Sequence, residues 1–236
     1  MKDLVRLGSE ADGGYIVTKK SVDASTLVIS MGLNDDWSFE EEFTTKANAK
    51  AKVLCFDHTV TPKFWVRHAL RSIRMGKLGS VGKYFSYKSF FSQPGIQHRK
   101  MMIGYDGPGA TSLATLMKEI DDQNIFLKID IEGWEYRIFE DVIASQDRVT
   151  AIAMELHDID LHRDRITDFL SRLKNFTLIH LHGNNYGGVD AGGDPLVIEL
   201  TLVRNDLVEP ATDGPASSIA VLPNNPALPE IDLVYG

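Results

Sequence analysis

The sequence IFLKIDIEGWE, residues 125–135, contains the clearest passage from a strand into a helix in this chain. Its apolar run, Ile125–Ile131, is short and continuous, which is typical of a fully buried strand. Two acids and a glycine, Asp130, Glu132 and Gly133, end the run, and helical spacing then continues from Trp134 to about Ala144. A buried strand that leads directly into a helix indicates a parallel sheet.

The same alternation of apolar runs and helical spacing extends in both directions along the chain. Ser38, with Glu41 three residues later, predicts a capping box at the start of one helix. We therefore predict an α/β fold, a mostly parallel seven-stranded sheet with helices on both faces. The expected strands are 26–31, 51–57, 100–104, 125–131, 150–156, 177–181 and 196–203. The expected helices are 38–48, 62–75, 112–120, 134–144 and 161–173.

Composition and charge indicate how the chain is divided. We expect one domain over residues 1–205, with a basic, aromatic-rich insertion at about 62–99, and an extended proline-rich tail over 206–236. The one cysteine, Cys55, excludes an internal disulfide. No apolar run approaches the roughly 18 residues that cross a membrane. The first ten residues also lack the apolar stretch of a signal peptide, so we expect a soluble, cytoplasmic protein.

The net charge of −8 hides a strong asymmetry. Residues 46–105 contain twelve lysines and arginines and a single acid, Asp57, so this segment carries +11 and the rest of the chain −19. The average charge argues against a general polyanion binder. The split instead indicates two surfaces of opposite sign.

Polar residues collect where the predicted strands end. Ligands of open α/β sheets bind beyond the carboxyl ends of the strands, so these residues are the candidates for a site. They are Gly32, Asn34, Asp35 and Asp36; Asp57 and His58; Asp106 and Gly107; Asp130, Glu132 and Gly133; Glu155, His157 and Asp158; and His180, His182, Asn184 and Asn185.

The turn after the first strand indicates which cofactor this site would accept. It lacks the G-x-G-x-x-G pattern of a dinucleotide site, and it carries Asp35 and Asp36 with three glutamates just beyond. Carboxylates repel a pyrophosphate, whereas they favour S-adenosylmethionine, which has a sulfonium, an ammonium and no phosphate. Asp57 stands where an acid can accept ribose hydroxyls. The alternative is that these acids only cap the following helix.

Residues Leu127–Glu135 resemble the LKIDxEGxE signature of FkbM-type methyltransferases. The resemblance covers roughly residues 6–203, including AMELH at 153–157 and DGGY at 12–15, which is similar to a methyltransferase-like subgroup of that family. It implies a Rossmann-like class I fold and S-adenosylmethionine-dependent O-methylation of a sugar or another hydroxylated acceptor. The usual family turn, D-x-G-A-N-x-G, reads SMGLNDD at 30–36, so Gly32 and Asn34 match and Ser30 departs.

Several residues are expected to carry the chemistry. Methyl transfer to a hydroxyl needs a positioned acceptor and a base. His157 is the preferred base and His182 the second choice, with Asp130 and Glu155 as further catalytic candidates; His180 is expected to be a core or capping residue. The residues expected to bind the cofactor are Gly14, Gly32, Asn34, Asp57, His58, Asp106 and Asp130.

A divalent metal is not expected, because the sequence has no tight ligand motif such as H-x-x-x-H or C-x-x-C. If an ion is used, carboxylate and imidazole ligands of the kind that bind magnesium, manganese or iron are available. The candidate ligands are Asp130, Glu155, His157 and His182.

The basic segment interleaves cations with aromatic residues, and Arg67, Arg71 and Arg74 form a stripe at helical spacing. It suits an anionic acceptor such as a nucleotide-linked sugar or an acidic glycan, or else it is a solvated helix face or a homo-oligomer contact. Nucleic acid is disfavoured by the net charge, and no membrane partner is expected. Two other functions stay open: a non-catalytic binding module on a degenerate methyltransferase fold, and a nicotinamide-dependent oxidoreductase.

Overall fold

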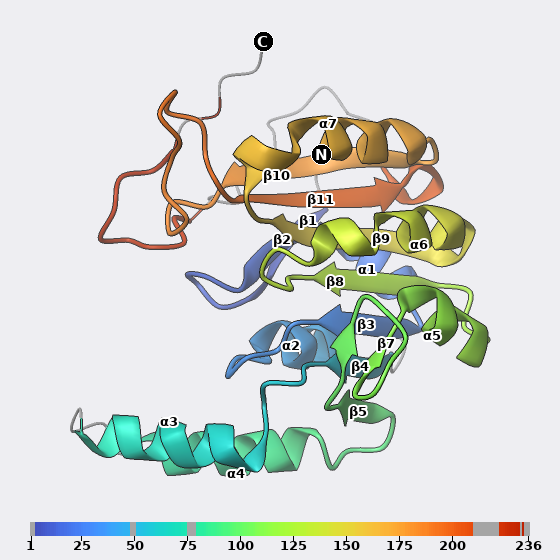
Figure 1. Cartoon of the computed structure of the whole chain (residues 1–236). Coiled ribbons are helices and arrows are strands. Elements are labelled where there is room, and N and C mark those ends of the chain that lie inside the picture. The colour runs from blue at the N-terminus through green and yellow to red at the C-terminus, as the bar shows by residue number, and fades with distance from the viewer. Residues whose placement is uncertain (1–2, 48–50, 75–78, 210–221, 232, 234–236) are drawn as a thin grey trace.

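The computed structural model describes residues 3–47, 51–74, 79–209, 222–231 and 233 (Figure 1). Its centre is a seven-stranded sheet in the order β10-β11-β9-β8-β3-β4-β5. β11 is antiparallel to both of its neighbours, and the other pairings are parallel, which confirms the predicted sheet. The strands are β3 (Leu27–Met31), β4 (Lys52–Phe56), β5 (Ile96–Arg99), β8 (Ile125–Ile129), β9 (Val149–Leu156), β10 (Phe176–Gly183) and β11 (Ile198–Arg204).

Helices cover both faces of the sheet because the central strands are apolar on both faces. In β3, Leu27 and Ile29 pack into one hydrophobic cluster and Val28 into the other. The first cluster includes residues of α5 (Leu113–Glu119), α6 (Phe139–Ser145) and α7 (Ile159–Arg172); the second includes residues of α2 (Ser38–Lys46), of α1 (Lys19–Ala24) and of the antiparallel hairpin β1 (Leu4–Gly8) and β2 (Gly14–Thr18). Short 3-10 turns lie at Glu135–Arg137, Gln146–Arg148 and Asn205–Leu207.

The predicted third strand, Lys100–Gly104, was wrong. The strand that pairs with β4 is β5, which falls inside the range expected to be an insertion. Met102–Ile103 (β6) pairs instead with Ala110–Thr111 (β7) in a separate two-stranded sheet. β5 forms the edge of the main sheet, where a half-exposed sequence such as IQHR is tolerated. The run at 100–104 is more apolar, and for that reason it was predicted as the strand instead.

The predicted capping box at Ser38 was also wrong. Ser38 is the first residue of α2, Trp37 occupies the N-cap without a side-chain capping bond, and Asp36 accepts a hydrogen bond from the Ser38 N–H at 2.9 Å. The helix predicted from Trp134 to Ala144 is divided into the 3-10 turn Glu135–Arg137 and α6.

Two helices, α3 (Pro62–Arg74) and α4 (Gly79–Phe90), form an arm that projects from the β5 edge of the sheet (Figure 1). They pack through aromatic residues, with the Trp65 and Tyr87 rings 5.1 Å apart. α3 keeps Lys63, Arg67, Arg71 and Arg74 exposed. Lys77, a further cation of this segment, lies outside the described residues.

The described part of the C-terminal tail, residues 222–231, lies against the body. Ile231 pairs with Gly183 of β10, and the Asn224 carbonyl accepts a hydrogen bond from the Asp12 N–H at 3.2 Å. Residues 210–221, which belong to the tail expected over 206–236, lie outside the described residues. Within the described part of the chain, no helix is long and apolar enough to span a membrane.

Candidate active site

A cavity of about 730 Å³ lies beyond the carboxyl ends of β3, β4, β8 and β9. Its wall includes seven carboxylates and two lysines, Lys83 and Lys128. Lys83 is paired with Asp35 at 2.7 Å, so its charge is already balanced. The cavity is therefore strongly acidic. Its carboxylates belong to Asp12, Asp35, Asp36, Asp57, Asp130, Glu132 and Glu155.

Gly32 forms the floor where β3 meets β8. Its φ of +87° is a left-handed conformation, and a Cβ there would lie 1.7 Å from the Asp130 carbonyl oxygen. Only glycine fits such an approach, so the residue brings the first turn directly against the end of β8. Asn34, two residues on, also has a positive φ of 47°, which asparagine tolerates better than most residues.

Asp57 holds this turn from the end of β4. Its Oδ2 accepts the N–H groups of Leu33 at 3.1 Å and Asn34 at 2.8 Å, and its Oδ1 accepts the N–H and hydroxyl of Thr59 at 2.7 and 2.6 Å. Burial opposes the charge, but these hydrogen bonds lower the pKa of Asp57. Since a carboxylate offers about four acceptor positions, the protein itself already uses all of them.

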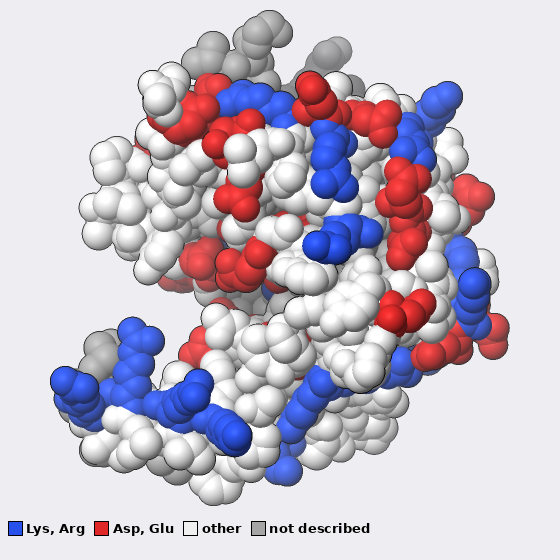
Figure 2. All heavy atoms as spheres, viewed as in Figure 1, with Lys and Arg blue, Asp and Glu red and all other residues white. Residues whose placement is uncertain are grey.

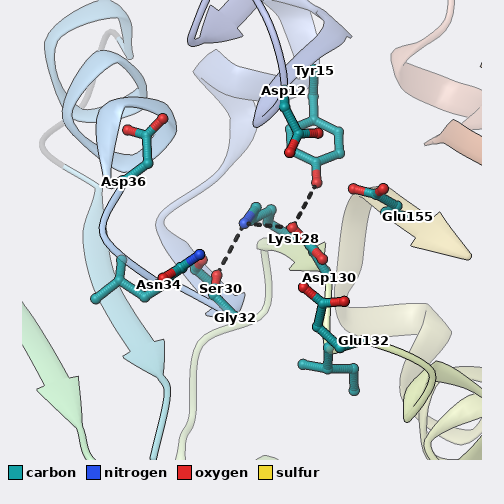
Figure 3. A network of polar contacts seen from close by, with 12 residues as sticks. Asp12, Tyr15, Ser30, Gly32, Asn34, Asp36, Lys128, Asp130, Glu132 and Glu155 are labelled. Atoms are coloured by element: carbon teal, nitrogen blue, oxygen red, sulfur yellow. Dashed lines mark hydrogen bonds and ion pairs between the residues drawn. The ribbon is translucent and has the colours of Figure 1, made fainter. Parts of the chain in front are cut away.

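A buried lysine lies at the centre of the cavity wall (Figure 3). Lys128 Nζ donates to the Gly32 carbonyl at 3.0 Å, lies 3.7 Å from Asp130 Oδ2, and sits 5.6 Å from the Tyr15 ring centroid. Tyr15 also donates to Asp130 Oδ2 at 3.4 Å. Burial would lower the pKa of Lys128, but the charges of Asp130, Glu40 and Glu155 raise it, so the ammonium is retained.

His157 follows β9 and is held from behind by a fully buried carboxylate. Its Nδ1 lies 3.1 Å from Glu135 Oε1, which also accepts the N–H groups of Ile131 and Gly133. Its Nε2 lies 3.6 Å from the exposed Glu132 carboxylate, on the cavity side. Burial would lower the pKa of His157, but the hydrogen bond and charge of Glu135, with Glu155 and Asp130, raise it to about 9.

Glu155 completes the wall at the end of β9. Burial, reinforced by the charges of Asp130 and Glu199, raises its pKa to about 9. Asn184 donates to its Oε1 at 2.7 Å. Glu155 and His157 are close enough to influence each other, with His157 Nε2 3.9 Å from Glu155 Oε1, so the two groups titrate as a pair that holds protons at neutral pH.

Of the residues predicted to be catalytic or to bind the cofactor, the structure brings seven together. All of them line the one cavity, although this placement does not test their roles. They are Gly32, Asn34, Asp57, His58, Asp130, Glu155 and His157.

The other three residues predicted to be catalytic or to bind the cofactor do not line the cavity. Gly14 is buried in the hairpin beside Arg6, and its neighbour Gly13 lines the cavity instead. Asp106 accepts from the Ser112 N–H and hydroxyl and from Thr115, so it holds the start of α5. His182 lies on β10 between Glu199 and Glu230.

The metal ligands predicted together are therefore divided, because His182 is separated from the other three. One ligand atom from each of Asp130, Glu132 and His157 does lie within 4.8 Å of the others. This triad could hold a cation inside the cavity.

Sequence reasoning gave no role to Lys128, Glu135 or Tyr15. A signal existed for the first two, because a lysine within an otherwise apolar strand and an acid at the start of a buried turn both need partners. Tyr15 offered no such signal, since only the packing of the hairpin on the sheet places its hydroxyl beside Asp130.

Comparison with known proteins identifies a matching family model and several solved structures of low sequence identity. Residues 26–180 match the family model described as the methyltransferase FkbM domain. A search of curated proteins finds no match.

Among solved structures, an rRNA methylase from Streptococcus thermophilus is 14% identical, with a TM-score of 0.43, over 79% of this chain and 90% of that one. A precorrin-6y C5,15-methyltransferase from Geobacter metallireducens is 10% identical, with a TM-score of 0.42, over 79% and 84%. The 23S rRNA methyltransferase ErmE is 10% identical, with a TM-score of 0.45, over 81% and 69%.

Proposed function

The chain belongs to the FkbM family of S-adenosylmethionine-dependent methyltransferases, and we propose that its cavity transfers the methyl group of that cofactor to a hydroxyl of an anionic, sugar-like acceptor. The observation that carries the proposal is the acidic wall beyond the carboxyl ends of the strands. A sulfonium and an ammonium gain from nearby carboxylates, whereas a phosphate would be repelled. Both lysines of the wall are paired with acids, Lys83 with Asp35 and Lys128 with Asp130.

The residues present fit the cofactor in three places. The turn at Gly32 brings backbone close to any ligand above β3, as a nucleoside needs. Asp130 and Glu132 offer carboxylates to cationic groups. Asp57 stands where ribose hydroxyls would be accepted, but its four acceptor positions are filled, so the Thr59 contacts have to give way when a ribose binds. The cofactor supplies the electrophilic methyl group when bound.

The proton of the acceptor hydroxyl would pass to His157. Its Nδ1–H is directed to Glu135, which leaves Nε2 on the cavity side as the acceptor of that proton. Because the folded protein raises the pKa of His157, only the minority of molecules with a neutral imidazole carry out this step at pH 7. Glu155 Oε1 lies 3.9 Å from this nitrogen and acts on the proton affinity of His157 through its charge.

The choice of an anionic acceptor rests on the arm formed by α3 and α4. Figure 2 shows lysine and arginine side chains along the side of the arm that faces the body, opposite acidic side chains across a hollow. The exposed cations of α3 are Lys63, Arg67, Arg71 and Arg74. An acceptor with negative charge at one end and hydroxyls at the other would contact both sides of this hollow.

Calorimetry with S-adenosylhomocysteine tests the proposal. We expect binding by the unmodified chain and an affinity at least tenfold lower for Asp130→Asn. The matched control is Asp160→Asn, which removes the same charge from an exposed residue of α7. Binding of NADH but not of S-adenosylhomocysteine would reject the proposal. Cofactor binding without methyl transfer to any hydroxylated acceptor would favour the non-catalytic module.

A further inference from the structure

A second group of metal-binding side chains lies outside the cavity, on the antiparallel pair β10 and β11. His182 stands directly opposite Glu199, and His180 is two residues earlier on β10, so all three project from the same face of the sheet. One ligand atom from each lies within 4.8 Å of the other two. His182 and Glu199 are buried, and His180 is half-buried.

The two nitrogens of His182 face different carboxylates. Nε2 is hydrogen-bonded to Glu230, from the described part of the C-terminal tail, while Nδ1 lies 3.5 Å from Glu199 Oε2. When Nε2 carries the proton that Glu230 accepts, Nδ1 and Oε2 turn lone pairs toward each other. Burial would lower the pKa of His182, but its hydrogen bonds to Glu199 and Glu230 raise it, so a proton on Nδ1 satisfies both atoms and a bound cation would displace that proton. A carboxylate that orients the far nitrogen of a ligating histidine is the usual outer partner of a metal site.

His180 is available as the third ligand. Its ring centroid is 6.1 Å from that of His182. Among the residues that the structure describes, no hydrogen bond engages the His180 side chain, although Arg6 is near enough to act on its charge. The Arg6 guanidinium is itself held by the Ser9 and Ala11 carbonyls, and Glu199 and Glu230 place two carboxylates beside His182.

We propose that His180, His182 and Glu199 bind one Zn²⁺ ion, with Glu230 orienting His182 from the outer shell. Two imidazoles and one carboxylate are a ligand set that zinc favours, with a fourth position left to water. Tetrahedral zinc places its ligand atoms about 3.3 Å apart, so His182 and Glu199 need little movement and His180 closes the remaining distance. The ion would fasten the tail to the sheet through Glu230 and through Asn224, which donates to Glu199.

This site is separate from the cavity, although carboxylate oxygens of Glu199 and Glu155 lie within 4.8 Å of each other and the charge of Glu199 acts on Glu155. Glu199 is the cross-strand neighbour of Glu155, so the ion would lie one strand away from the cavity wall. The competing explanation is that His182, Glu199, Glu230 and Asn224 form only a hydrogen-bonded clasp for the tail. The two explanations differ in whether zinc itself binds to the chain and raises its unfolding midpoint.

The experiment uses the full chain after treatment with EDTA and titrates it with zinc chloride in a calorimeter, with thermal unfolding measured in parallel. We expect one ion per chain and a rise in the unfolding midpoint. His180→Ala should lose at least a hundredfold in zinc affinity and lose the zinc-dependent rise. Glu230→Gln should weaken binding by about 10- to 100-fold, as outer-shell changes do.

Two controls make the result specific. His162→Ala removes a histidine that packs on Tyr136, and it should bind zinc as the unmodified chain does. His157→Ala tests the cavity triad, and it should also keep the single ion. Absence of zinc binding by a folded unmodified chain overturns the proposal, as does binding that survives His180→Ala but is lost in His157→Ala. S-adenosylhomocysteine binding by His180→Ala shows that the variant is folded and separates this result from the test of methyl transfer.

Discussion

At the scale of single residues, the site depends on acids whose environments differ sharply. Asp57 is surrounded by N–H and hydroxyl donors, which lower its pKa, whereas Glu155 is surrounded by other carboxylates and by apolar packing, which raise its pKa. Glu135 has no exposed surface and is tied to His157 and to the turn that follows β8. Neighbouring acids can therefore serve as a turn clamp, a proton carrier and a support for a base.

The shifted pair Glu155 and His157 makes stability depend on pH. The folded chain keeps protons on both groups up to about pH 9, whereas the unfolded chain releases them near the ordinary values of 4.5 and 6.5. The native state thus binds more protons between pH 7 and 9, and the free energy of unfolding should fall as pH rises, by up to about 1.4 kcal/mol per pH unit for each extra proton. Urea unfolding at pH 7, 8 and 9 measures how the free energy of unfolding changes with pH.

Glu155→Gln provides the comparison for that measurement. It removes one of the two protonation sites while keeping the shape and the Asn184 contact, so its stability should change less steeply over the same range. An equal slope in both proteins would show that other groups cause the dependence.

At the scale of elements, the junction of β3 and β8 is the tightest point of the site. Gly32→Ala places a methyl group 1.7 Å from backbone, so we expect a loss of several kcal/mol in the free energy of unfolding. Gly109→Ala is the matched control, because Gly109 has a similar φ of +74° but nothing within 4 Å of its would-be Cβ. It should cost only about 1–2 kcal/mol for the left-handed backbone. Equal losses in chemical denaturation would refute the close-approach explanation.

Substitutions at Asp106 and Asp57 distinguish an acid that stabilises a helix end from an acid that supports cofactor binding. Asp106→Asn should lower the thermal midpoint, because Asp106 accepts three hydrogen bonds at this helix end, and should leave S-adenosylhomocysteine affinity unchanged. Asp57→Asn should lower S-adenosylhomocysteine affinity, since it loosens the turn at Leu33 and Asn34. Reduced affinity in Asp106→Asn would return that residue to the cofactor site. Differential scanning fluorimetry and calorimetry give the two readouts.

At the scale of the whole molecule, charge is divided between an acidic cavity and a basic arm. The cavity wall carries seven carboxylates, and α3 presents a row of exposed arginines on the arm. Figure 2 shows basic side chains on the arm and acidic side chains on the body facing each other across a hollow. The net charge of −8 is the sum of +11 over residues 46–105 and −19 over the rest of the chain, so the average hides both regions.

Combining Arg67→Gln, Arg71→Gln and Arg74→Gln should weaken binding of a uronic-acid oligosaccharide severalfold while leaving S-adenosylhomocysteine affinity unchanged. The physical reason is loss of charge complementarity on the arm alone. Calorimetry at low ionic strength measures both ligands, with a neutral oligosaccharide of equal length as the ligand control. The variant control removes three cations from α7 and its end, Arg163, Arg172 and Lys174. Equal effects of the two triple variants would count against a docking role for the arm.

The sequence alone was sufficient for the alternation of strands and helices, the mostly parallel sheet and the family signature at Leu127–Glu135. These features are local: apolar periodicity and motif spacing need no knowledge of distant partners. For the same reason the sequence located the carboxyl ends of the strands, and with them six of the seven carboxylates that line the cavity.

The edge strand, the partners of His182 and the pKa shifts depended on contacts between residues that are distant in the sequence. The polar run Ile96–Arg99 became the edge strand because an edge accepts half-exposed residues, and no local pattern indicates which strand stands at an edge. His182 joined Glu199 and Glu230, far along the chain, rather than His157. Hydrogen-bond saturation of Asp57 and the shifted pKa values of Glu155 and His157 arise from neighbours that only tertiary packing supplies, because burial and Coulomb interactions depend on distance in space and not on separation in sequence.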